Sequence, residues 1–460
     1  MNIDPLIAIV GSDAVVTDPE RLGAHTRDWT GRWKGTTPAV LFPSSTAQVA
    51  AIVAWCAESG TALVPQGGNT GMVGGGVPLG GEVVLNLTRL DGLDVDAEAG
   101  VVVAGAGATL AAVQNAARDA GWMYGVDLGA RDSATIGGTV ATNAGGLHVI
   151  RHGDTRHQLL GIEAVTGTGE IVGDLRGLHK DNTGYHLPSL LAGSEGTLAV
   201  ITRVCLRLCV PPAETAVALL AFDTEPDAFA AVGPIRRGVT DLQALEIVFA
   251  SGVDLVCETF DLAPPFPVDP ARPAHAAYLL VEAAGAPGMV DRLGEAVTGV
   301  SAAVADAAVA TTDAQRSGLW RYREAHTEAI SLRGVPHKLD VTIPLDAMNS
   351  TVAEIRSAVA NHSARTDPGG AELWLFGHAG DGNLHVNITG VNPDDHALDR
   401  RVLEIVADAG GSISAEHGIG RAKTRDLSLN RTPSEIALAT QLKAAFDPAG
   451  ILNPGVIVET

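Results

Sequence analysis

The chain has 460 residues, 46% of them hydrophobic, and its formal net charge is −22 at pH 7. This length predicts two or three domains with enough apolar material for a core. An acidic surface repels phosphate backbones, which argues against a nucleic-acid-binding protein. The chain also lacks the run of about 18 apolar residues that a membrane-spanning helix requires.

The cysteines and the N-terminus bear on the compartment. The four cysteines form no CxxC cluster, so we expect packed free thiols and no iron–sulfur module. Residues 1–13 carry early acidic residues and no basic segment before their short apolar run. We therefore predict no signal or transit peptide, and a reducing, cytoplasmic location.

Hydrophobic periodicity and turn residues predict the elements of the first half. Ser44–Thr46 can cap a helix in which Val49, Ile52, Val53 and Cys56 recur at helical spacing. We expect strands at 39–43, 61–64, 83–87, 101–104 and 198–208, a second helix at 109–120, and a hairpin of 162–166 with 171–172 around Gly167-Thr168-Gly169.

The texture changes after Pro211-Pro212. Alanine-rich stretches at 225–232 and 289–309 predict helices, and they alternate with strands expected at 277–282 and 373–376. Residues 446–455 read as a helix end followed by an extended tail. The expected plan is a domain at 1–208, a second at 209–425, and a segment at 426–460 that returns to the first.

Three loops are rich in glycine and other small residues: Pro65–Gly71, Asp127–Gly146 and Leu191–Leu198. Adjacent glycines let backbone N–H groups form a concave nest for phosphate oxygens, although the first loop alone reads equally well as a tight turn between strands. Three such loops together suit a long cofactor. Gly105–Leu110 lacks the third glycine of a dinucleotide-binding motif, so we interpret it as an ordinary strand–helix turn.

Two histidines, His378 and His385, flank a loop that Gly380 and the Asp381-Gly382 dipeptide can reverse, and Glu416-His417 adds a carboxylate and a third imidazole. Three of these four side chains could hold a divalent cation with one position open for a substrate. For each histidine alone, a hydrogen-bonded hairpin or core residue is the alternative. Asp381 reads as a turn residue or as a group that orients an imidazole.

Positive charge gathers in two short segments. Arg323 and Thr327 are four residues apart, which predicts that they share one helix face, where arginine can clamp a carboxylate. Lys338 lies in an alternating stretch typical of a strand. These cations suit a dianionic substrate, although a solvated helix and strand remain the alternative.

Six motifs occur in a fixed order between about residues 39 and 455: PQGGNTG, GVDLGARDSATIGGTVATNAGG, GSEGTLAVIT, GHAGDGNLHVN, SAEHG and LNPG. In these motifs the chain resembles the FAD-linked 2-hydroxyacid dehydrogenases of the vanillyl-alcohol-oxidase-type flavoproteins. The resemblance implies an α+β fold, with a two-subdomain FAD-binding domain and an α+β cap domain, built on an antiparallel sheet, that binds substrate and metal.

The resemblance also implies which residues contact FAD. The first loop (65–76) contains no histidine, so we expect non-covalent FAD. The implied contacts are Pro65, Gln66, Gly67, Gly68, Asn69, Thr70, Gly71, Asp127, Ser133, Ile136, Gly137, Gly138, Thr139, Asn143, Gly145, Glu195, Gly196, Ile201 and Asn453.

Within the family the match is strongest to enzymes that oxidise D-2-hydroxyglutarate to 2-oxoglutarate, with the C2 hydride passing to flavin N5. The resemblance implies a divalent metal, for which zinc is the first choice and manganese or iron also suit the donors. It assigns His378, His385 and Glu416 as metal ligands, His417 as general base, and Arg323, Thr327, Lys338, Asn387 and His417 as substrate contacts.

Several alternatives stay open. Within the family these are D-lactate, glycolate or D-malate dehydrogenases, although the D-lactate enzymes differ at the positions of Thr327 and Lys338. From other classes they are an NADPH-dependent flavin reductase and a non-catalytic flavin- or metal-binding protein. The family further implies a small 2-hydroxy diacid as substrate, an electron-transfer flavoprotein, a quinone or an iron–sulfur partner as electron acceptor, and a homodimer.

Overall fold

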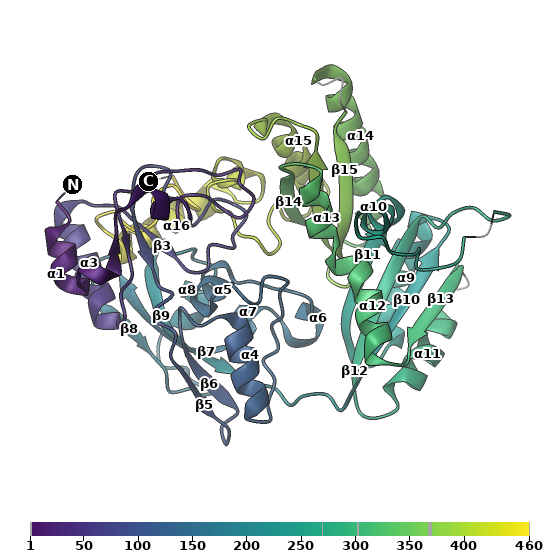
Figure 1. Ribbon diagram of the computed structural model, residues 1–460, viewed down its shortest axis with the longest axis horizontal. Coiled ribbons are helices and arrows are strands. Elements are labelled where there is room, and N and C mark those ends of the chain that lie inside the picture. The colour runs from purple at the N-terminus through teal and green to yellow at the C-terminus, as the bar shows by residue number, and fades with distance from the viewer. Residues whose placement is uncertain (1, 269, 301–302, 367–369, 460) are drawn as a thin grey trace. The chain divides into compact units, whose positions relative to one another are not determined.

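The computed structural model describes residues 2–268, 270–300, 303–366 and 370–459 (Figure 1). The chain forms two compact units, and both are discontinuous in sequence. Unit 1 consists of Met1–Gly146, His152–Pro211 and Glu416–Thr460, and unit 2 of Leu147–Arg151 and Pro212–Ala415. Helices and sheets are mixed in both, so the predicted α+β class is confirmed.

Unit 1 contains two sheets. The four-stranded sheet has the order β1-β2-β4-β3, with β2, β4 and β3 parallel, and the five-stranded sheet β5-β6-β9-β7-β8 is antiparallel throughout. The strands are β1 (Val15–Val16), β2 (Val40–Leu41), β3 (Leu63–Gln66), β4 (Val83–Asn86), β5 (Leu93–Asp96), β6 (Val101–Gly105), β7 (Leu159–Thr166), β8 (Ile171–Asp174) and β9 (Ala199–Arg207).

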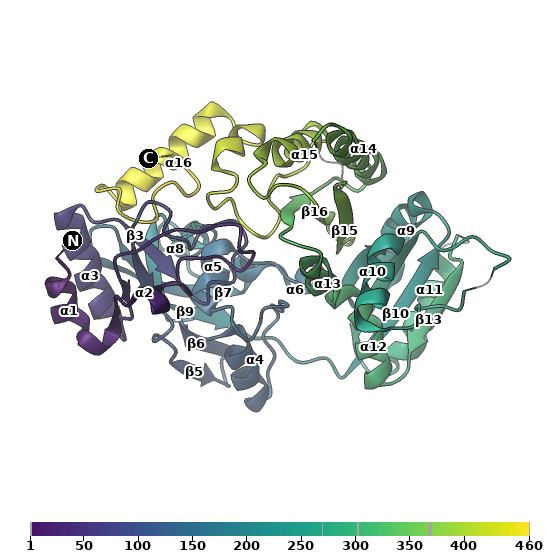
Figure 2. The ribbon, with the colours of Figure 1, turned by 45° about the horizontal axis from the view of Figure 1, so that its top comes forward.

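Helices cover these sheets through the apolar faces that the sequence predicts. At the start of α3 (Thr46–Ser59) the Ser45 hydroxyl accepts from Gln48 N, and Gly60 ends the helix with φ of 67°. The four residues predicted at helical spacing are buried against β3 and β4. Helix α1 (Asp4–Val10) lies beside α3 (Figure 2). The helical segments in unit 1 or at its border are α1 (Asp4–Val10), η1 (Ser12–Ala14), α2 (Pro19–Leu22), α3 (Thr46–Ser59), α4 (Leu110–Asp119), α5 (Ile136–Thr142), α6 (Val149–His152), α7 (Thr155–Gln158), α8 (Leu187–Leu191), η2 (Thr424–Leu429) and α16 (Pro433–Phe446).

The C-terminal segment is built into the parallel sheet. After α16 ends at Phe446, Leu452 forms a bridge with Leu63 on β3. The buried Lys443 ammonium donates to the carbonyls of Thr197 (2.9 Å) and Leu452 (2.6 Å) and pairs with Asp447. A buried ammonium requires such partners, so this lysine fixes the path of the tail.

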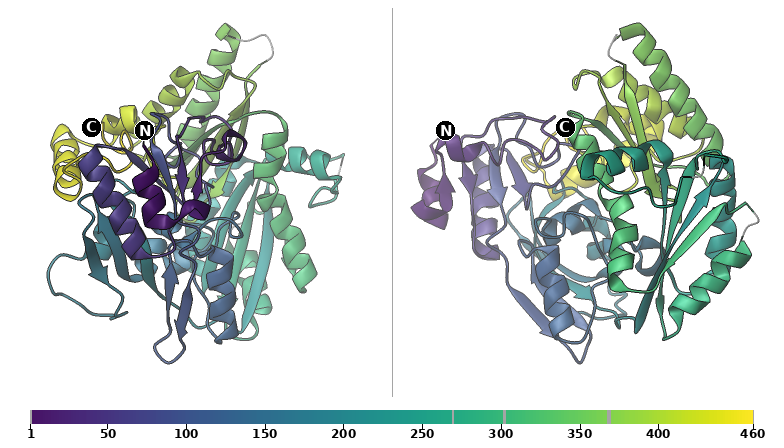
Figure 3. Two further views of the ribbon diagram at one scale, coloured as in Figure 1. Left: turned by 60° about the vertical axis from the view of Figure 1, so that its left-hand side comes forward. Right: turned by 45° about the vertical axis from the view of Figure 1, so that its right-hand side comes forward.

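Unit 2 is organised around one antiparallel seven-stranded sheet, with the order β13-β10-β12-β11-β15-β16-β14, and helices lie on both of its faces (Figure 3). Helices α10, α12 and α13 supply buried residues to the main apolar cluster on one face. The elements are β10 (Glu214–Phe222), α9 (Glu225–Gly238), β11 (Leu242–Phe249), α10 (Ala250–Phe260), β12 (Ala277–Gly285), α11 (Met289–Val300), β13 (Asp306–Ala310), α12 (Asp313–Glu324), α13 (His326–Leu332), β14 (His337–Thr342), α14 (Met348–Thr366), β15 (Glu372–His378), β16 (Asn383–Thr389) and α15 (His396–Asp408).

Two sequence predictions for unit 2 are wrong in part. The helix expected at 289–309 ends at Val300, residues 301–302 lie outside the described ranges, and 306–310 form the edge strand β13. Pairing with β10 overrides the helix preference of these alanines. Arg323 and Thr327 do not share one helix, because α12 ends at Glu324 and Thr327 belongs to α13, which begins at His326.

Two further expectations concern the whole described chain. The four cysteines are free thiols, as predicted, with Cys56 and Cys205 buried. Within the described ranges, no helix combines the length and the apolarity that crossing a membrane would need.

Candidate active site

The first two predicted flavin loops pack directly against each other in unit 1. A Cβ atom at Gly67 would collide with Thr135 Oγ1, and one at Gly68 would collide with the carbonyl of Ser133. Both positions therefore require glycine. In contrast, a Cβ at Gly71 or Gly129 would meet nothing within 4 Å, so the loops keep an open side.

Backbone strain is concentrated in the predicted flavin residues. Among the described residues, seven non-glycine residues have positive φ, and four of them are in the predicted set: Asn69, Asn143, Glu195 and Asn453, with φ between 43° and 54°. Such conformations cost free energy and persist where the surroundings impose them, most often at ligand sites.

Three buried polar atoms in these loops or in the C-terminal segment have no hydrogen-bond partner among the described residues: Thr135 Oγ1, Ser194 Oγ and Asn453 Oδ1. Unsatisfied buried groups are uncommon in folded proteins and usually mark a ligand or an ordered water. Together with the glycine-lined open side, they fit a long polar cofactor such as FAD.

Other predicted flavin residues use their side chains within the protein. Gln66 bonds His25, Gly76 and Asn86, and Asn143 donates to Asp154. Any contact of these two residues with a cofactor would therefore come from their backbones. Similarly, Asn69 donates to the carbonyls of Ala24 and Arg27, Asp127 contacts Gln114 and Arg131, and Ile136, Thr139 and Ile201 are buried in α5 and β9.

The histidine-bearing hairpin forms in unit 2 as predicted. Strands β15 and β16 pair antiparallel, and residues 379–382 form the turn that connects them. In this turn Asp381 Oδ1 accepts from Asn383 N, and Gly382 has φ of 84°. Asp381 is thus a turn residue, one of the two roles considered for it.

Strand register places the polar side chains on one face. Lys338 lies opposite Asn387 and Asp340 opposite His385, and directly paired residues point to the same side of a sheet. His378 is on that side too, with its ring centroid 5.3 Å from that of His385.

Two buried carboxylates, missed in the sequence, hold the histidines. Glu246 on β11 is 1% exposed, and its Oε1 lies 2.7 Å from His378 Nδ1. Asp340 is fully buried, and its Oδ1 lies 3.3 Å from His385 Nδ1 and accepts from Asn383 Nδ2 at 2.7 Å. The single acid within the mostly apolar strand 242–249 was the available signal for Glu246.

These carboxylates set the chemistry of the imidazoles. Burial lowers the pKa of His385, with Asp340 opposing the shift, so the ring is neutral near pH 7. Burial alone would raise the pKa of Glu246, but His378 and Arg323 bring it below its ordinary value. An ionised carboxylate only accepts hydrogen bonds, so it fixes the proton on Nδ1 and the lone pair on Nε2, the form that binds metals.

Glu416 and His417 directly follow unit 2 along the chain. The N–H of Ala415 donates to the carbonyl of Asp340 (3.2 Å), so covalent continuity keeps the next two residues near β14. One ligand atom each from His378, His385 and Glu416 lie within 4.8 Å of one another.

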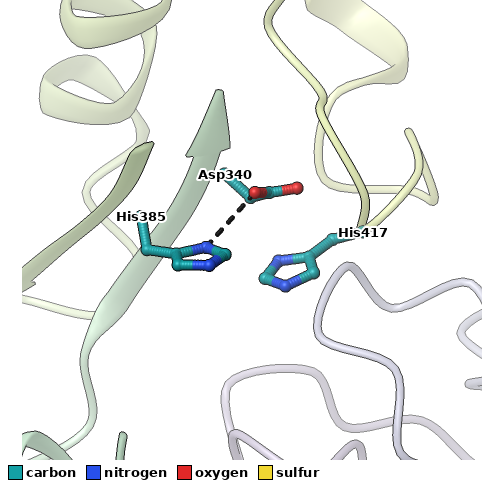
Figure 4. A group of neighbouring side chains, drawn as sticks. All are labelled: Asp340, His385 and His417. Carbon is teal, nitrogen blue, oxygen red and sulfur yellow. Dashed lines mark ion pairs between the residues drawn. The ribbon is translucent and has the colours of Figure 1, made fainter. Parts of the chain in front are cut away.

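Asp340, His385 and His417 form a second group whose ligand atoms also lie within 4.8 Å of one another (Figure 4). Because Asp340 already accepts from Asn383 and contacts His385 Nδ1, we regard it as an orienting carboxylate. We therefore keep His378, His385 and Glu416 as the candidate ligands, a set of two imidazoles and one carboxylate that would leave a position open on a bound cation.

Within unit 1, the flavin loops hold the segment that carries Glu416. Gly146 N donates to Glu416 Oε1 at 2.6 Å, and Glu195 accepts from Ile419 N and Gly420 N, both at 2.8 Å. Burial raises the pKa of Glu195 to about 7 against the lowering effect of these two amides.

The predicted substrate-binding residues are buried or half-buried, which argues against the alternative of a solvated helix and strand. Arg323 is 7% exposed, with Cζ 4.5 Å from the centroid of the Phe376 ring, and its Nε donates to Glu246 Oε2 at 2.7 Å. Burial lowers the pKa of Lys338 to about 8. Asn387 is 3% exposed, and its Nδ2 has no partner among the described residues, while Thr327 is half-buried on α13.

Known protein families match both halves of the chain. Residues 37–173 match the family model "FAD binding domain", and 211–457 match "FAD linked oxidases, C-terminal domain". The chain is 39% identical to a D-2-hydroxyglutarate dehydrogenase of Xanthomonas citri pv. viticola, over 96% of this chain and 94% of the relative. It is 38% identical to the mitochondrial D-2-hydroxyglutarate dehydrogenase of Bos taurus, over 97% and 81%.

A solved structure shows the same fold at low identity. The 4-ethylphenol oxidase from Gulosibacter chungangensis superposes with a TM-score of 0.78 at 18% identity, over 99% of this chain and 96% of the other. The chain therefore belongs to the FAD-linked oxidases of the vanillyl-alcohol-oxidase fold and is an FAD-dependent dehydrogenase.

Proposed function

We propose that the protein oxidises D-2-hydroxyglutarate to 2-oxoglutarate with FAD and a divalent metal ion. The observation that carries the proposal is the cluster of His378, His385 and Glu416, in which a buried carboxylate faces Nδ1 of each histidine. The printed names of the relatives support the choice of substrate.

The donor set suits several cations. Two neutral imidazoles and one carboxylate bind Zn²⁺, Mn²⁺ or Fe²⁺, and zinc is our first choice. A cation held there would lower the pKa of a substrate hydroxyl, as it does for bound water.

The neighbouring side chains then divide the remaining work. His417 accepts the hydroxyl proton, and Arg323, Lys338, Thr327 and Asn387 bind the substrate's polar groups. Two cations on an otherwise acidic protein favour a diacid over D-lactate or glycolate. Bound FAD, held non-covalently by the loops of unit 1, supplies the acceptor for the C2 hydride.

The biological setting is part of the same proposal. We assign residues 1–208 to FAD binding, 209–425 to substrate and metal binding, and 426–460 to the returning segment. We further propose that the protein is a cytoplasmic homodimer and that it passes electrons to an electron-transfer flavoprotein or a quinone. The Bos taurus relative, in contrast, is named as mitochondrial.

Anaerobic flavin bleaching tests the proposal directly. The purified protein is mixed with a panel of D- and L-2-hydroxy acids, with and without prior removal of metal by a chelator. We expect D-2-hydroxyglutarate to bleach the flavin fastest, and only when metal is present. Equal rates with D-lactate would refute the substrate, unchanged rates after chelation would refute the metal, and bleaching by NADPH alone would favour a flavin reductase.

A further inference from the structure

Glu246 connects a predicted metal ligand to a predicted substrate-binding residue. Its two oxygens have different partners: Oε1 lies 2.7 Å from His378 Nδ1, and Oε2 lies 2.7 Å from Arg323 Nε. The residue is 1% exposed, and all three side chains belong to unit 2. A single rigid carboxylate therefore sets the distance between the imidazole and the guanidinium.

The elements around Glu246 make this arrangement specific. Strand register pairs Glu246 directly with His378, which places their side chains on the same face of the sheet. Arg323 reaches the pair from α12, and its guanidinium stacks on Phe376. Because Glu246 takes Nε, the edge with Nη1 and Nη2 is the part of the guanidinium that suits a bidentate carboxylate.

Stability alone is a weak reason to keep this carboxylate. Burying an ion pair costs desolvation, and well-packed apolar residues of similar volume often stabilise a fold as well or better. Strand β11 is otherwise almost entirely apolar and buried. A lone acid there is better explained by the geometry that it imposes on its two partners.

We propose that Glu246 is a positioning residue that locks His378 and Arg323 into one geometry, so that the metal and a substrate carboxylate are bound in a fixed relation. The proposal rests on the proposed function and adds to it a residue that touches neither ligand itself. Removal of the carboxylate then weakens metal binding and substrate binding together.

Glu246→Gln tests this because an amide has only one accepting oxygen. If that oxygen faces Arg323, the amide NH₂ faces His378 Nδ1 and shifts the imidazole proton to Nε2, the nitrogen that would bind the metal. If it faces His378, Arg323 loses its acceptor. Glu246→Asp keeps the charge but is one methylene shorter, so it cannot reach both partners equally well.

Glu282 provides a matched control on the neighbouring strand β12. It is also buried, and it also accepts from two side chains, Trp320 Nε1 (2.7 Å) and His148 Nε2 (3.0 Å), neither of which is in the predicted site. Glu282→Gln therefore reproduces the loss of a buried, bridging carboxylate without touching the metal or substrate residues.

Two of the three readouts, metal binding and 2-oxoglutarate binding, are independent of turnover. Full-length, FAD-loaded protein is stripped of metal and titrated calorimetrically with Zn²⁺ and Mn²⁺. Binding of 2-oxoglutarate to the metal-loaded protein is then followed by the flavin absorbance shift, and KM and kcat are measured separately. We expect Glu246→Gln to weaken metal binding about 10- to 100-fold and to raise KM, Glu246→Asp to fall between, and Glu282→Gln to stay within about threefold of wild type.

Each outcome decides between distinct statements. The positioning role is overturned if Glu246→Gln keeps a metal affinity within about threefold of wild type. It is also overturned if Glu282→Gln loses as much metal affinity as Glu246→Gln does. If Glu246→Gln does not fold, a wild-type metal affinity in Glu246→Asp overturns it. Wild-type protein that binds no metal and oxidises no 2-hydroxy acid refutes the proposed function itself, and the positioning role with it.

Discussion

The backbone N–H of Gly146 donates a 2.6 Å hydrogen bond to the Glu416 carboxylate. Gly146 ends the second small-residue loop of the FAD-binding unit, and Glu416 is a predicted metal ligand. This hydrogen bond to Oε1 ties the predicted ligand to the end of that loop.

Glu416→Gln should weaken metal binding without unfolding the protein. The amide oxygen can still accept from Gly146 N, but the negative charge that a divalent cation requires is lost. We expect at least a tenfold lower affinity for Zn²⁺ or Mn²⁺ and a melting temperature of the stripped protein within about 2 °C of wild type. Calorimetric titration and thermal unfolding measure the two quantities.

Asp340→Asn serves as the comparison for Glu416→Gln. If Asp340 only orients His385, its substitution should weaken metal binding less than Glu416→Gln does. The reverse order would show that the metal uses Asp340, His385 and His417 instead.

Lys338 should make substrate affinity depend on pH. Its pKa is lowered by burial to about 8, and only the ammonium form attracts a dianion. KM for the diacid should therefore rise about tenfold between pH 7 and 9. Lys338→Met should raise KM about 10- to 100-fold at pH 7 and remove this rise. A KM that is flat with pH in the wild type would exclude this role.

The contribution of Lys338 to folding stability should increase with pH, whereas its contribution to substrate affinity should decrease. Between pH 8 and 10.5 the unfolded chain binds more protons at Lys338 than the folded chain does. Its contribution to stability therefore increases as the pH rises through that range. Urea unfolding of wild type and Lys338→Met at both ends of the range gives the difference.

Asn387→Leu should separate binding from stability. The buried Nδ2 of Asn387 has no hydrogen-bond partner among the described residues, and such a group costs about 1–3 kcal/mol. Leucine of similar volume should raise the free energy of unfolding of the substrate-free protein by about 1 kcal/mol and raise KM at least tenfold. Lower stability with unchanged KM would make Asn387 a purely structural residue.

Glu195 should make stability fall as the pH rises. Its pKa in the folded protein is raised from 4.5 to about 7, so the folded chain binds more protons between these values, and this contribution is lost above about pH 7. The free energy of unfolding should decrease between pH 4.5 and 7 by up to about 3 kcal/mol from this group. Glu195→Gln should lack that component, which a difference between matched urea titrations would show; parallel curves would contradict it.

The sequence predicted those features that depend on local signals. The His378–His385 hairpin followed from Gly380 and the Asp381-Gly382 turn, and α3 from its cap and apolar spacing. Glu246 escaped prediction because its role depends on which strand lies next to β15, and that neighbour, β11, is more than a hundred residues away in the chain. Pairing between distant strands cannot be read from a local pattern.

The wrong element boundaries have a similar cause. Residues 306–310 are alanine-rich and favour a helix, but β10 offers an unpaired edge that they complete. The one-residue break between α12 and α13 at Ala325 is not specified by composition either. For residues 306–310, tertiary pairing outweighed intrinsic preference.

The discontinuity of the two units has a consequence for biosynthesis. Every residue of unit 2 has been synthesised once Ala415 leaves the ribosome, whereas unit 1 still lacks Glu416–Thr460, including Leu452, which pairs with β3, and the buried Lys443. We therefore expect the second unit to fold first, in reverse of the usual N-to-C order. A nascent chain stalled with residue 415 just outside the ribosome should resist protease across 212–415 while its first 211 residues are still digested.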